Sequence, residues 1–206
     1  MLIKPFRALK TRKPGILGNK PIFNSAVLLP LVEKKGQVCV LFEVRAKNLR
    51  RQPGEICFPG GRIEAIDQDP SQTAIRETCE ELGLSAENIE VIAPLDLLIT
   101  PFNTVIHPFL CKIDNISRLN PNPHEVAEIF YVPLNFLYTY APITYYLRVK
   151  LLLPDDFPYD LIPNGKDYNW REGFYPEYFY LYQDYVIWGM TAQILHHFIK
   201  LTREYF

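Results

Sequence analysis

The chain has 206 residues, of which 48% are hydrophobic, and a formal net charge of −1. This length suits one domain of ordinary size, and the balanced charge argues against a nucleic-acid or membrane-surface partner. The longest apolar run, residues 26–32, is far too short to span a bilayer. The cysteines form no CxxC pair, which favours free thiols in a reducing compartment; they lie at positions 39, 57, 79 and 111.

The N-terminal segment is basic. The first 32 residues contain six cations and no acid: Lys4, Arg7, Lys10, Arg12, Lys13 and Lys20. We interpret residues 1–23 as an N-terminal basic arm and residues 24–206 as a single domain. A mitochondrial presequence is the alternative for the arm, although the stretch is poor in serine. The last three residues are not a peroxisomal tripeptide, and we therefore expect a cytoplasmic location.

The first elements predicted along the chain are a hairpin and a helix. Residues 24–32 and 37–45 are rich in β-forming residues and are joined by Glu-Lys-Lys-Gly, a hairpin signal. A polar loop follows and leads to an acidic turn. We expect the next helix to have Asp69 as its N-cap, Pro70 at its first position and Gly83 at its end.

In the rest of the chain, the predicted helices and strands do not alternate regularly. We expect strands at residues 90–98, 105–113, 126–132 and 143–153 and around 179–187, and an amphipathic helix from about residue 189 to the end. The proline-rich segment at about 154–177 reads as a loop insertion, and a loop of that length tends to be functional or mobile. Strands combined with two or three helices, without strict alternation, predict an α+β domain with a mixed sheet flanked by helices.

The predicted helix gathers three glutamates, Glu77, Glu80 and Glu81, on the side opposite its apolar residues. Arg76 at their edge can pair with Glu80 four residues later, which leaves Glu77 and Glu81 uncompensated. A solvated acidic face explains such a pattern. A hard divalent cation explains it too, because Mg²⁺ takes oxygen ligands and binds few carboxylates.

The residues before this helix favour the cation. Gly60-Gly61 precedes the helix, and paired glycines let a backbone approach an ion or phosphate closely. The stretch 61-GRIEAIDQDPSQTAIRETCEELGL-84 resembles the signature of the Nudix hydrolases. Its core is intact and reads Arg76-Glu77-x-x-Glu80-Glu81-x-Gly83. The spacer is one residue longer than the generic one, so Gln68, between Asp67 and Asp69, falls where the signature has a glutamate. Thr78 replaces an aliphatic residue.

The preceding flank, 41-LFEVRAKNLRRQPGEICFPGG-61, resembles the signature of the coenzyme A diphosphatase branch. The positions that match it without a gap are Arg45-Ala46, Arg50, Gly54 and Phe58-Pro59-Gly60-Gly61. The branch begins with Leu-Leu-Thr, whereas this chain has Leu41-Phe42-Glu43. The segments 125-EVAEIFYVPL-134 and 187-IWGMTAQIL-195 also resemble parts of the branch.

The resemblance implies the Nudix fold, an α/β/α sandwich with a mixed sheet between helices. It also implies metal-dependent hydrolysis of the pyrophosphate bond of coenzyme A or its derivatives, to 3′,5′-ADP and 4′-phosphopantetheine or acyl-phosphopantetheine. We expect Glu77 and Glu81 to bind Mg²⁺ or Mn²⁺ with the Gly61 carbonyl. Glu80 binds a second metal or orients Arg76. Glu125 is a candidate general base, and an exposed glutamate at a strand start is an equally good reading of it.

The substrate-binding residues expected from the flank are Arg45, Arg50, Arg51, Gly54, Phe58 and Gly60. The loop holds four cations within seven residues, and arginine's planar fork suits phosphate oxygens. Taken alone, such a loop reads as an ordinary basic surface. Two other functions stay open: a Nudix hydrolase of another nucleoside diphosphate derivative such as ADP-ribose, and a non-catalytic nucleotide-binding module. The partner is then a small molecule, and the oligomeric state is left open, with a homodimer as one option.

Overall fold

The structure is a computed structural model that describes residue 16 and residues 23–67 and 69–205. The expected basic arm, residues 1–23, therefore lies outside the described residues except at its positions 16 and 23. The strands are β1 (Phe23–Lys34), β2 (Gln37–Arg45), β3 (Ile56–Cys57), β4 (Gly60–Arg62), β5 (Ile89–Pro94), β6 (Leu98–Ile99), β7 (Thr104–Ile113), β8 (Val126–Pro133), β9 (Ile143–Val149), β10 (Gly173–Tyr182) and β11 (Tyr185–Ile187). The helices are α1 (Pro70–Leu82), α2 (Leu134–Thr139) and α3 (Gly189–Thr202).

The main sheet is mixed, as the sequence predicts. Its central path runs β3-β2-β1-β7-β5, with β4 on β1, β6 on β7 and β8 on β2. β1 pairs with β7 in parallel, whereas it pairs with β2 and β4 in antiparallel fashion. The tight turn between β1 and β2 has Lys35 and Gly36 at positive φ, which is the backbone that a two-residue hairpin requires.

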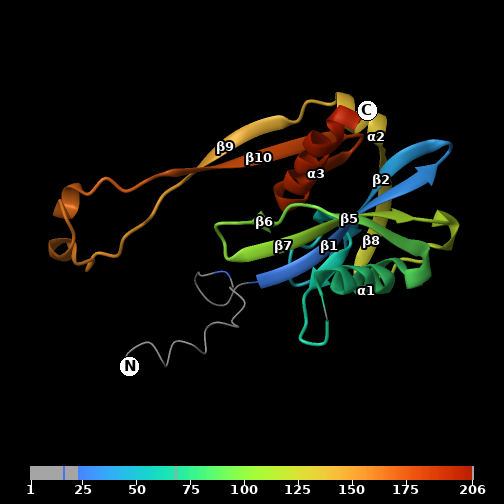
Figure 1. Ribbon diagram of the computed structural model, residues 1–206, viewed down its shortest axis with the longest axis horizontal. Helices are drawn as coiled ribbons and strands as arrows, with labels where there is room; N and C mark the ends of the chain where they lie inside the picture. Colours follow the sequence, from blue (N-terminus) through green and yellow to red (C-terminus); the bar gives the residue numbers. More distant parts are fainter. Residues whose placement is uncertain (1–15, 17–22, 68, 206) are drawn as a thin grey trace, which may run out of the picture.

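Helices cover both faces of this sheet (Figure 1). Because side chains alternate along a strand, neighbouring residues of β1 enter different layers. Leu28 belongs to the cluster beneath α1, which also contains Leu82, while Leu29 belongs to the cluster that α3 covers with Phe198. The expected α/β/α arrangement with a mixed sheet between helices is confirmed.

The bounds of α1 are those expected from its end residues. Asp69 has extended backbone angles, and its Oδ1 accepts hydrogen bonds from the backbone N–H groups of Ser71 and Gln72 at 2.8 and 3.2 Å. Pro70 occupies the first turn, where no N–H donor is needed. Gly83 ends the helix with φ of 64°, and its N–H donates to the carbonyl of Cys79.

The cap at Asp69 allows a test of this helix end. We expect Asp69→Ala to lower the free energy of unfolding by about 1 kcal/mol, because two N–H groups lose their acceptor. The melting temperature should fall by roughly 2–4 °C in a chain of this size. Asp69→Asn, which keeps a side-chain oxygen, should melt close to the parent. An alanine variant that melts like the parent would show that this cap does not stabilise the fold.

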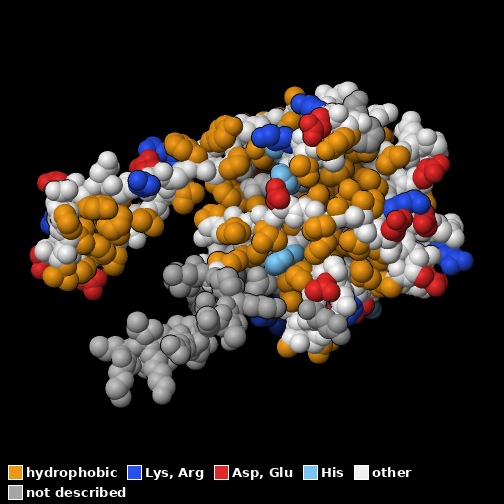
Figure 2. Space-filling view, in the orientation of Figure 1, with side chains coloured by type: hydrophobic (Ala, Val, Ile, Leu, Met, Phe, Trp, Pro, Cys, Tyr) orange, Lys and Arg blue, Asp and Glu red, His pale blue; other side chains and the backbone are white. Residues whose placement is uncertain are grey.

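The strands β9, β10 and β11 form a second sheet, and β9 and β10 extend from the domain as an arm (Figure 1). The loop expected at 154–177 is partly wrong, because β10 already begins at Gly173 and pairs with Val149 of β9. The far end of the arm holds Phe157 close to Trp170, with ring centroids 5.7 Å apart. Figure 2 shows hydrophobic side chains gathered at that end.

The helix α2 was not expected from the sequence. It has only six residues and no side-chain cap, and two leucines, Leu134 and Leu137, bury its inner face. So short an apolar run has no periodicity that distinguishes a helix from the end of a strand.

Candidate functional site

The candidate site lies where the C-terminal half of α1 meets β2 and β4. The carboxylate of Glu81 points into the protein and is 6% exposed, and its Oε2 accepts a hydrogen bond from the backbone N–H of Gly60 at 2.8 Å. Glu43 on β2 is fully buried nearby. The site is therefore built from a helix and two strands, not from the helix alone.

The expectation that the three helix glutamates share one exposed face is wrong. Glu81 falls on the buried side with Thr78 and Leu82, whereas the Glu80 side chain is 57% exposed. The reason is the position of the packed face, which contains Ala74, Thr78 and Leu82 and not Ile75 and Cys79 at its centre, so that Glu81 falls within it. There its carboxylate accepts the hydrogen bond from the N–H of Gly60.

Arg76 holds more partners than the sequence suggests. Its guanidinium lies 2.7 Å from Glu77 and 3.4 Å from Glu80, so Glu77 is not left uncompensated. It also forms two hydrogen bonds to Asp67, at 3.2 and 3.3 Å. This arginine holds the pKa of Asp67 down, to about 2. Asp67 lies beside Gln68, which aligns with the signature's mid-spacer glutamate, and it was not among the expected site residues.

The two glycines of FPGG fill different roles. Gly60 has φ of 144°, and a Cβ there would lie 2.3 Å from the carbonyl oxygen of Ala26. A Cβ on Gly61 would lie 2.4 Å from the carboxylate carbon of Glu77. Gly61 thus leaves room for the Glu77 carboxylate, and Gly60 lets β4 approach β1.

Glu125 reaches the same region through the loop before β8. The N–H groups of Asn120 and Asn122 donate to the carbonyls of Leu82 and Glu81, each at 2.9 Å, which docks this loop on the end of α1. The Glu125 carbonyl accepts from the N–H of Ala46 at 2.8 Å. Its carboxylate is close enough to raise the pKa values of Glu77 and Glu43.

Burial and mutual repulsion make these carboxylates hard to ionise. Burial first, and then the neighbouring Glu43, raise the pKa of Glu81 to about 9. Burial raises the pKa of Glu43 to about 7, and the pKa of Glu77 is raised for the same reason. A divalent cation would remove this repulsion, so the charge of the cluster fits Mg²⁺ or Mn²⁺.

The side chains are not arranged as a ready-made metal site. Among the described residues, no three His, Cys, Asp or Glu side chains are gathered closely enough to hold an ion. The hydrogen bonds explain why, since Glu77 is turned towards Arg76 and Glu81 towards Gly60. One oxygen, Oε2 of the buried Glu43, has no hydrogen-bond partner in the described part of the chain. A bound cation would therefore require Glu77 and Glu81 to turn.

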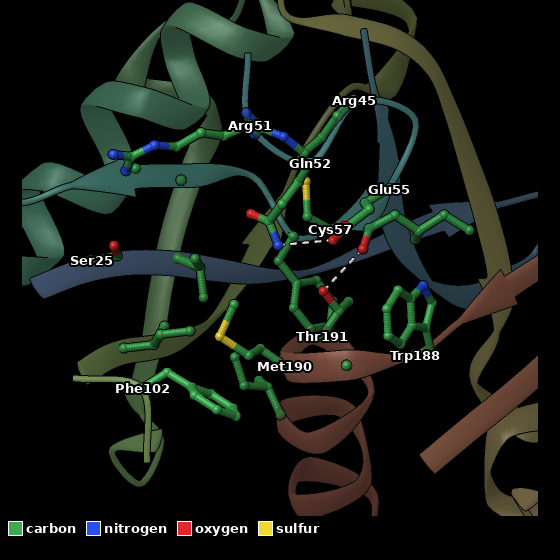
Figure 3. A pocket seen from close by; sticks show the side chains of 18 of the residues that line it. Ser25, Arg45, Arg51, Gln52, Glu55, Cys57, Phe102, Trp188, Met190 and Thr191 are labelled. Carbon is green, nitrogen blue, oxygen red and sulfur yellow. Dashed lines mark hydrogen bonds between the residues drawn. The ribbon is translucent and has the colours of Figure 1, made fainter. Parts of the chain in front are cut away.

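A pocket of about 420 Å³ opens beside the carboxylates, and Figure 3 shows its wall. Of the residues expected to bind substrate, Arg45, Arg51, Phe58 and Gly60 line it, together with Gly61. Phe58 is 3% exposed and stacks on Phe42 of the core, so its main contacts are within the fold.

Two expected substrate-binding residues, Arg50 and Gly54, are not among the described residues that line this pocket. Arg50 is exposed. Gly54 has φ of 74° and its N–H donates to the carbonyl of Arg45 at 3.1 Å, so it shapes the turn that carries the arginines.

The loop between β6 and β7 and the C-terminal part of the chain supply the opposite wall, which the sequence did not predict. The side chains on this wall are Phe102, Tyr175, Glu177, Trp188, Met190, Thr191 and Ile194. Thr191 Oγ1 donates to the carbonyl of Ile56 at 3.0 Å, and Glu177 Oε1 accepts from the N–H of Gly189 at 2.7 Å. In the sequence, only the resemblance of residues 187–195 to the branch indicates that this segment belongs to the site. No local pattern relates it to residues about 130 positions earlier.

Comparisons with known proteins agree with this geometry. The NUDIX domain family matches residues 23–149. The mouse "Peroxisomal coenzyme A diphosphatase NUDT7" is 37% identical over 123 residues, which cover 60% of this chain and 51% of the mouse protein. The human "Mitochondrial coenzyme A diphosphatase NUDT8" is 37% identical over 117 residues, 55% of this chain and 50% of the human protein. "Nudix hydrolase 3" of Caenorhabditis elegans is 32% identical over 188 residues, 86% of this chain and 73% of the worm protein.

The fold and the site define an α+β domain with a mixed sheet between helices and a cluster of buried carboxylates where a helix meets the sheet. The chain belongs to the Nudix family, as the family match and the worm relative show. It spans about half the length of the mouse and human relatives it matches. Nudix hydrolases generally use divalent metal ions. No helix among the described residues is both long and apolar enough to cross a bilayer.

Proposed function

We propose that this protein hydrolyses the pyrophosphate bond of coenzyme A or its derivatives, giving 3′,5′-ADP and 4′-phosphopantetheine or its acyl form. One observation carries the proposal: a single pocket joins Arg45 and Arg51 and the FPGG glycines to an apolar wall from the C-terminal segment. Coenzyme A has the matching halves, since its phosphates carry the negative charge and its pantetheine arm is uncharged, with methyl and methylene groups that can contact an apolar wall. The names of the mouse and human relatives support the same substrate.

The arginines are suited to bind the phosphates. Arg45 ends β2, Arg51 lies in the loop that follows, and Arg62 lines the pocket from the end of β4. Guanidinium groups form paired hydrogen bonds to phosphate oxygens, which fixes the pyrophosphate in one orientation. Phe102, Tyr175 and Trp188 present apolar surface across the pocket, and aromatic faces of this kind stack on adenine or cover an aliphatic arm.

Glu77, Glu81 and the Gly61 carbonyl would hold the divalent cation, Mg²⁺ or Mn²⁺. When bound, such a cation offsets the charge of the pyrophosphate oxygens and lowers the pKa of a coordinated water. Arg76 orients Glu77, and Asp67 and Glu80 in turn fix Arg76. Glu125 is the proposed general base, which takes the proton of the attacking water, because its carboxylate lies beside Glu77 and Glu43.

The test is product analysis by mass spectrometry. The chain should release 3′,5′-ADP and 4′-phosphopantetheine from coenzyme A with Mg²⁺ or Mn²⁺, and release nothing when EDTA removes the cation. We expect kcat/KM for coenzyme A to exceed that for ADP-ribose at least about tenfold, the scale on which a few pocket contacts discriminate substrates. Faster cleavage of ADP-ribose would contradict the substrate assignment. Tight nucleotide binding without any cleavage would support the non-catalytic alternative.

The location and the oligomeric state stay predictions. The cytoplasmic location rests on sequence alone, and the names of the mouse and human relatives carry peroxisomal and mitochondrial locations instead. A homodimer is equally untested.

A further inference from the structure

Glu43 is a buried carboxylate with no role in the assignments above. It lies on β2, where Leu41 two residues earlier packs in the cluster beneath α1. Because side chains alternate along a strand, Glu43 faces the same side of the sheet, towards α1 and Glu81. It is fully buried. A carboxylate in such a place is costly unless a partner compensates it.

Only one of the two carboxylate oxygens of Glu43 has a hydrogen-bond partner among the described residues. Oε1 accepts a hydrogen bond from the thiol of Cys57 at 3.1 Å, and a thiol is a weak donor. Oε2 has no partner among the described residues. Protonation does not remove the problem, because a hydroxyl at Oε2 would then lack an acceptor. The surrounding side chains therefore do not account for a carboxylate here.

The charges around Glu43 are mostly of its own sign. Glu81 and Glu125 interact with it unfavourably, and Arg45 is the cation that faces it. The Nε of Arg45 does not donate to Glu43: it is buried and has no hydrogen-bond partner among the residues that the structure describes. Three carboxylates thus share one arginine, in the region where Glu81 was assigned to a divalent cation.

We propose that Glu43 is a further ligand of that divalent cation, supplying a carboxylate oxygen beside Glu81. The proposal rests on the metal assignment of the proposed function and extends it to β2. A hard cation is the partner that a buried, unpaired carboxylate oxygen next to a second carboxylate suits best. The branch signature has threonine at this position, so this chain places an additional negative charge in its site. That charge should tighten binding of Mg²⁺ or Mn²⁺.

The experiment measures Mn²⁺ binding to the full chain without substrate, by electron paramagnetic resonance of the free ion and by calorimetry. The variants are Glu43→Gln, which keeps the shape, and Glu43→Thr, which restores the signature residue. Glu90→Gln, on the exposed surface of β5, controls for general loss of charge. We expect both Glu43 variants to raise the Kd for Mn²⁺ at least about tenfold and to shrink the rise in melting temperature that Mn²⁺ produces. Glu90→Gln should bind like the parent.

The outcomes separate this proposal from the proposed function. If a folded Glu43→Gln binds Mn²⁺ within twofold of the parent while Glu81→Gln does not, Glu43 is no ligand and the proposed function stands. If the parent neither binds Mn²⁺ nor cleaves coenzyme A, both proposals fall. If Glu43→Gln does not fold, the Kd of Glu43→Thr decides by the same criterion.

Discussion

Glu81→Gln is expected to abolish hydrolysis and, in the same protein, to raise the melting temperature without metal at pH 8. The loss of activity, about a thousandfold or more, follows if Glu81 binds the cation that stabilises the charge of the reaction. The gain in stability follows from its pKa, which burial and the neighbouring Glu43 raise to about 9 in the folded chain. A glutamine can still accept the hydrogen bond from Gly60 and carries no charge to repel Glu43.

Glu81 makes the stability of the fold depend on pH. In the unfolded chain Glu81 has an ordinary pKa near 4.5, so the folded state binds the proton more tightly. The contribution of Glu81 to stability is therefore most favourable below pH 4.5 and declines as pH rises towards 9, because folding must then either ionise the buried carboxyl or take up a proton. At pH 8, well above the unfolded pKa, folding must take up this proton, which lowers the stability relative to pH 5. Glu81→Gln removes this effect, which should raise the melting temperature by several degrees at pH 8 and by little at pH 5.

Calorimetric melting of parent and variant at these two pH values, with and without Mn²⁺, checks both halves. Mn²⁺ should stabilise the parent and leave Glu81→Gln nearly unchanged. Glu80→Gln is a useful comparison, since its side chain is mostly exposed and its charge costs little in the fold. If Glu81→Gln melts below the parent at pH 8, the carboxylate is not the destabilising group that its burial indicates.

The features that the sequence predicts well are those with a local cause. The start and end of α1 follow from the conformational and capping preferences of three residues, Asp69, Pro70 and Gly83. The structure confirms each of them. The hairpin at Lys35 and Gly36 has the same kind of cause. The Nudix core, from Arg76 to Gly83, is recognisable because its residues are fixed by spacing on one helix.

The features that it misses depend on where distant segments meet. A helix wheel centred on Ile75 and Cys79 puts Glu81 on the outer side of α1, whereas the face that packs contains Ala74 and Thr78, and Glu81 lies beside them. Its hydrogen-bond partner there, the N–H of Gly60, comes from β4. In the sequence, Glu43 is only a departure from the branch signature. The structure shows that it lies on β2 and faces α1. Trp188 enters the pocket because the start of α3 docks against β3. No local pattern encodes these three contacts, since each joins segments far apart in the chain.

Gly60→Ala is expected to destabilise the fold by at least about 4 kcal/mol, close to the whole stability of many domains. Gly60 has φ of 144°, a conformation that L-residues with a Cβ scarcely adopt. The added carbon would also lie 2.3 Å from the carbonyl oxygen of Ala26 and 2.6 Å from the Cα of Val27. Both are backbone atoms of the central strand β1, so neither can turn aside as a side chain could.

Urea unfolding of two further variants distinguishes the cost of a positive φ from the cost of steric overlap with β1. Gly36→Ala has a positive φ of 75° but no atom within 4 Å, so it should cost only about 1–2 kcal/mol. Gly61→Ala meets the side chain of Glu77, which can rotate away, so this variant should fold and weaken Mn²⁺ binding instead. If Gly60→Ala unfolds at the same urea concentration as Gly36→Ala, then β4 can move off β1 at little cost. The close approach that presents the Gly60 N–H to Glu81 would then not be a fixed property of the site.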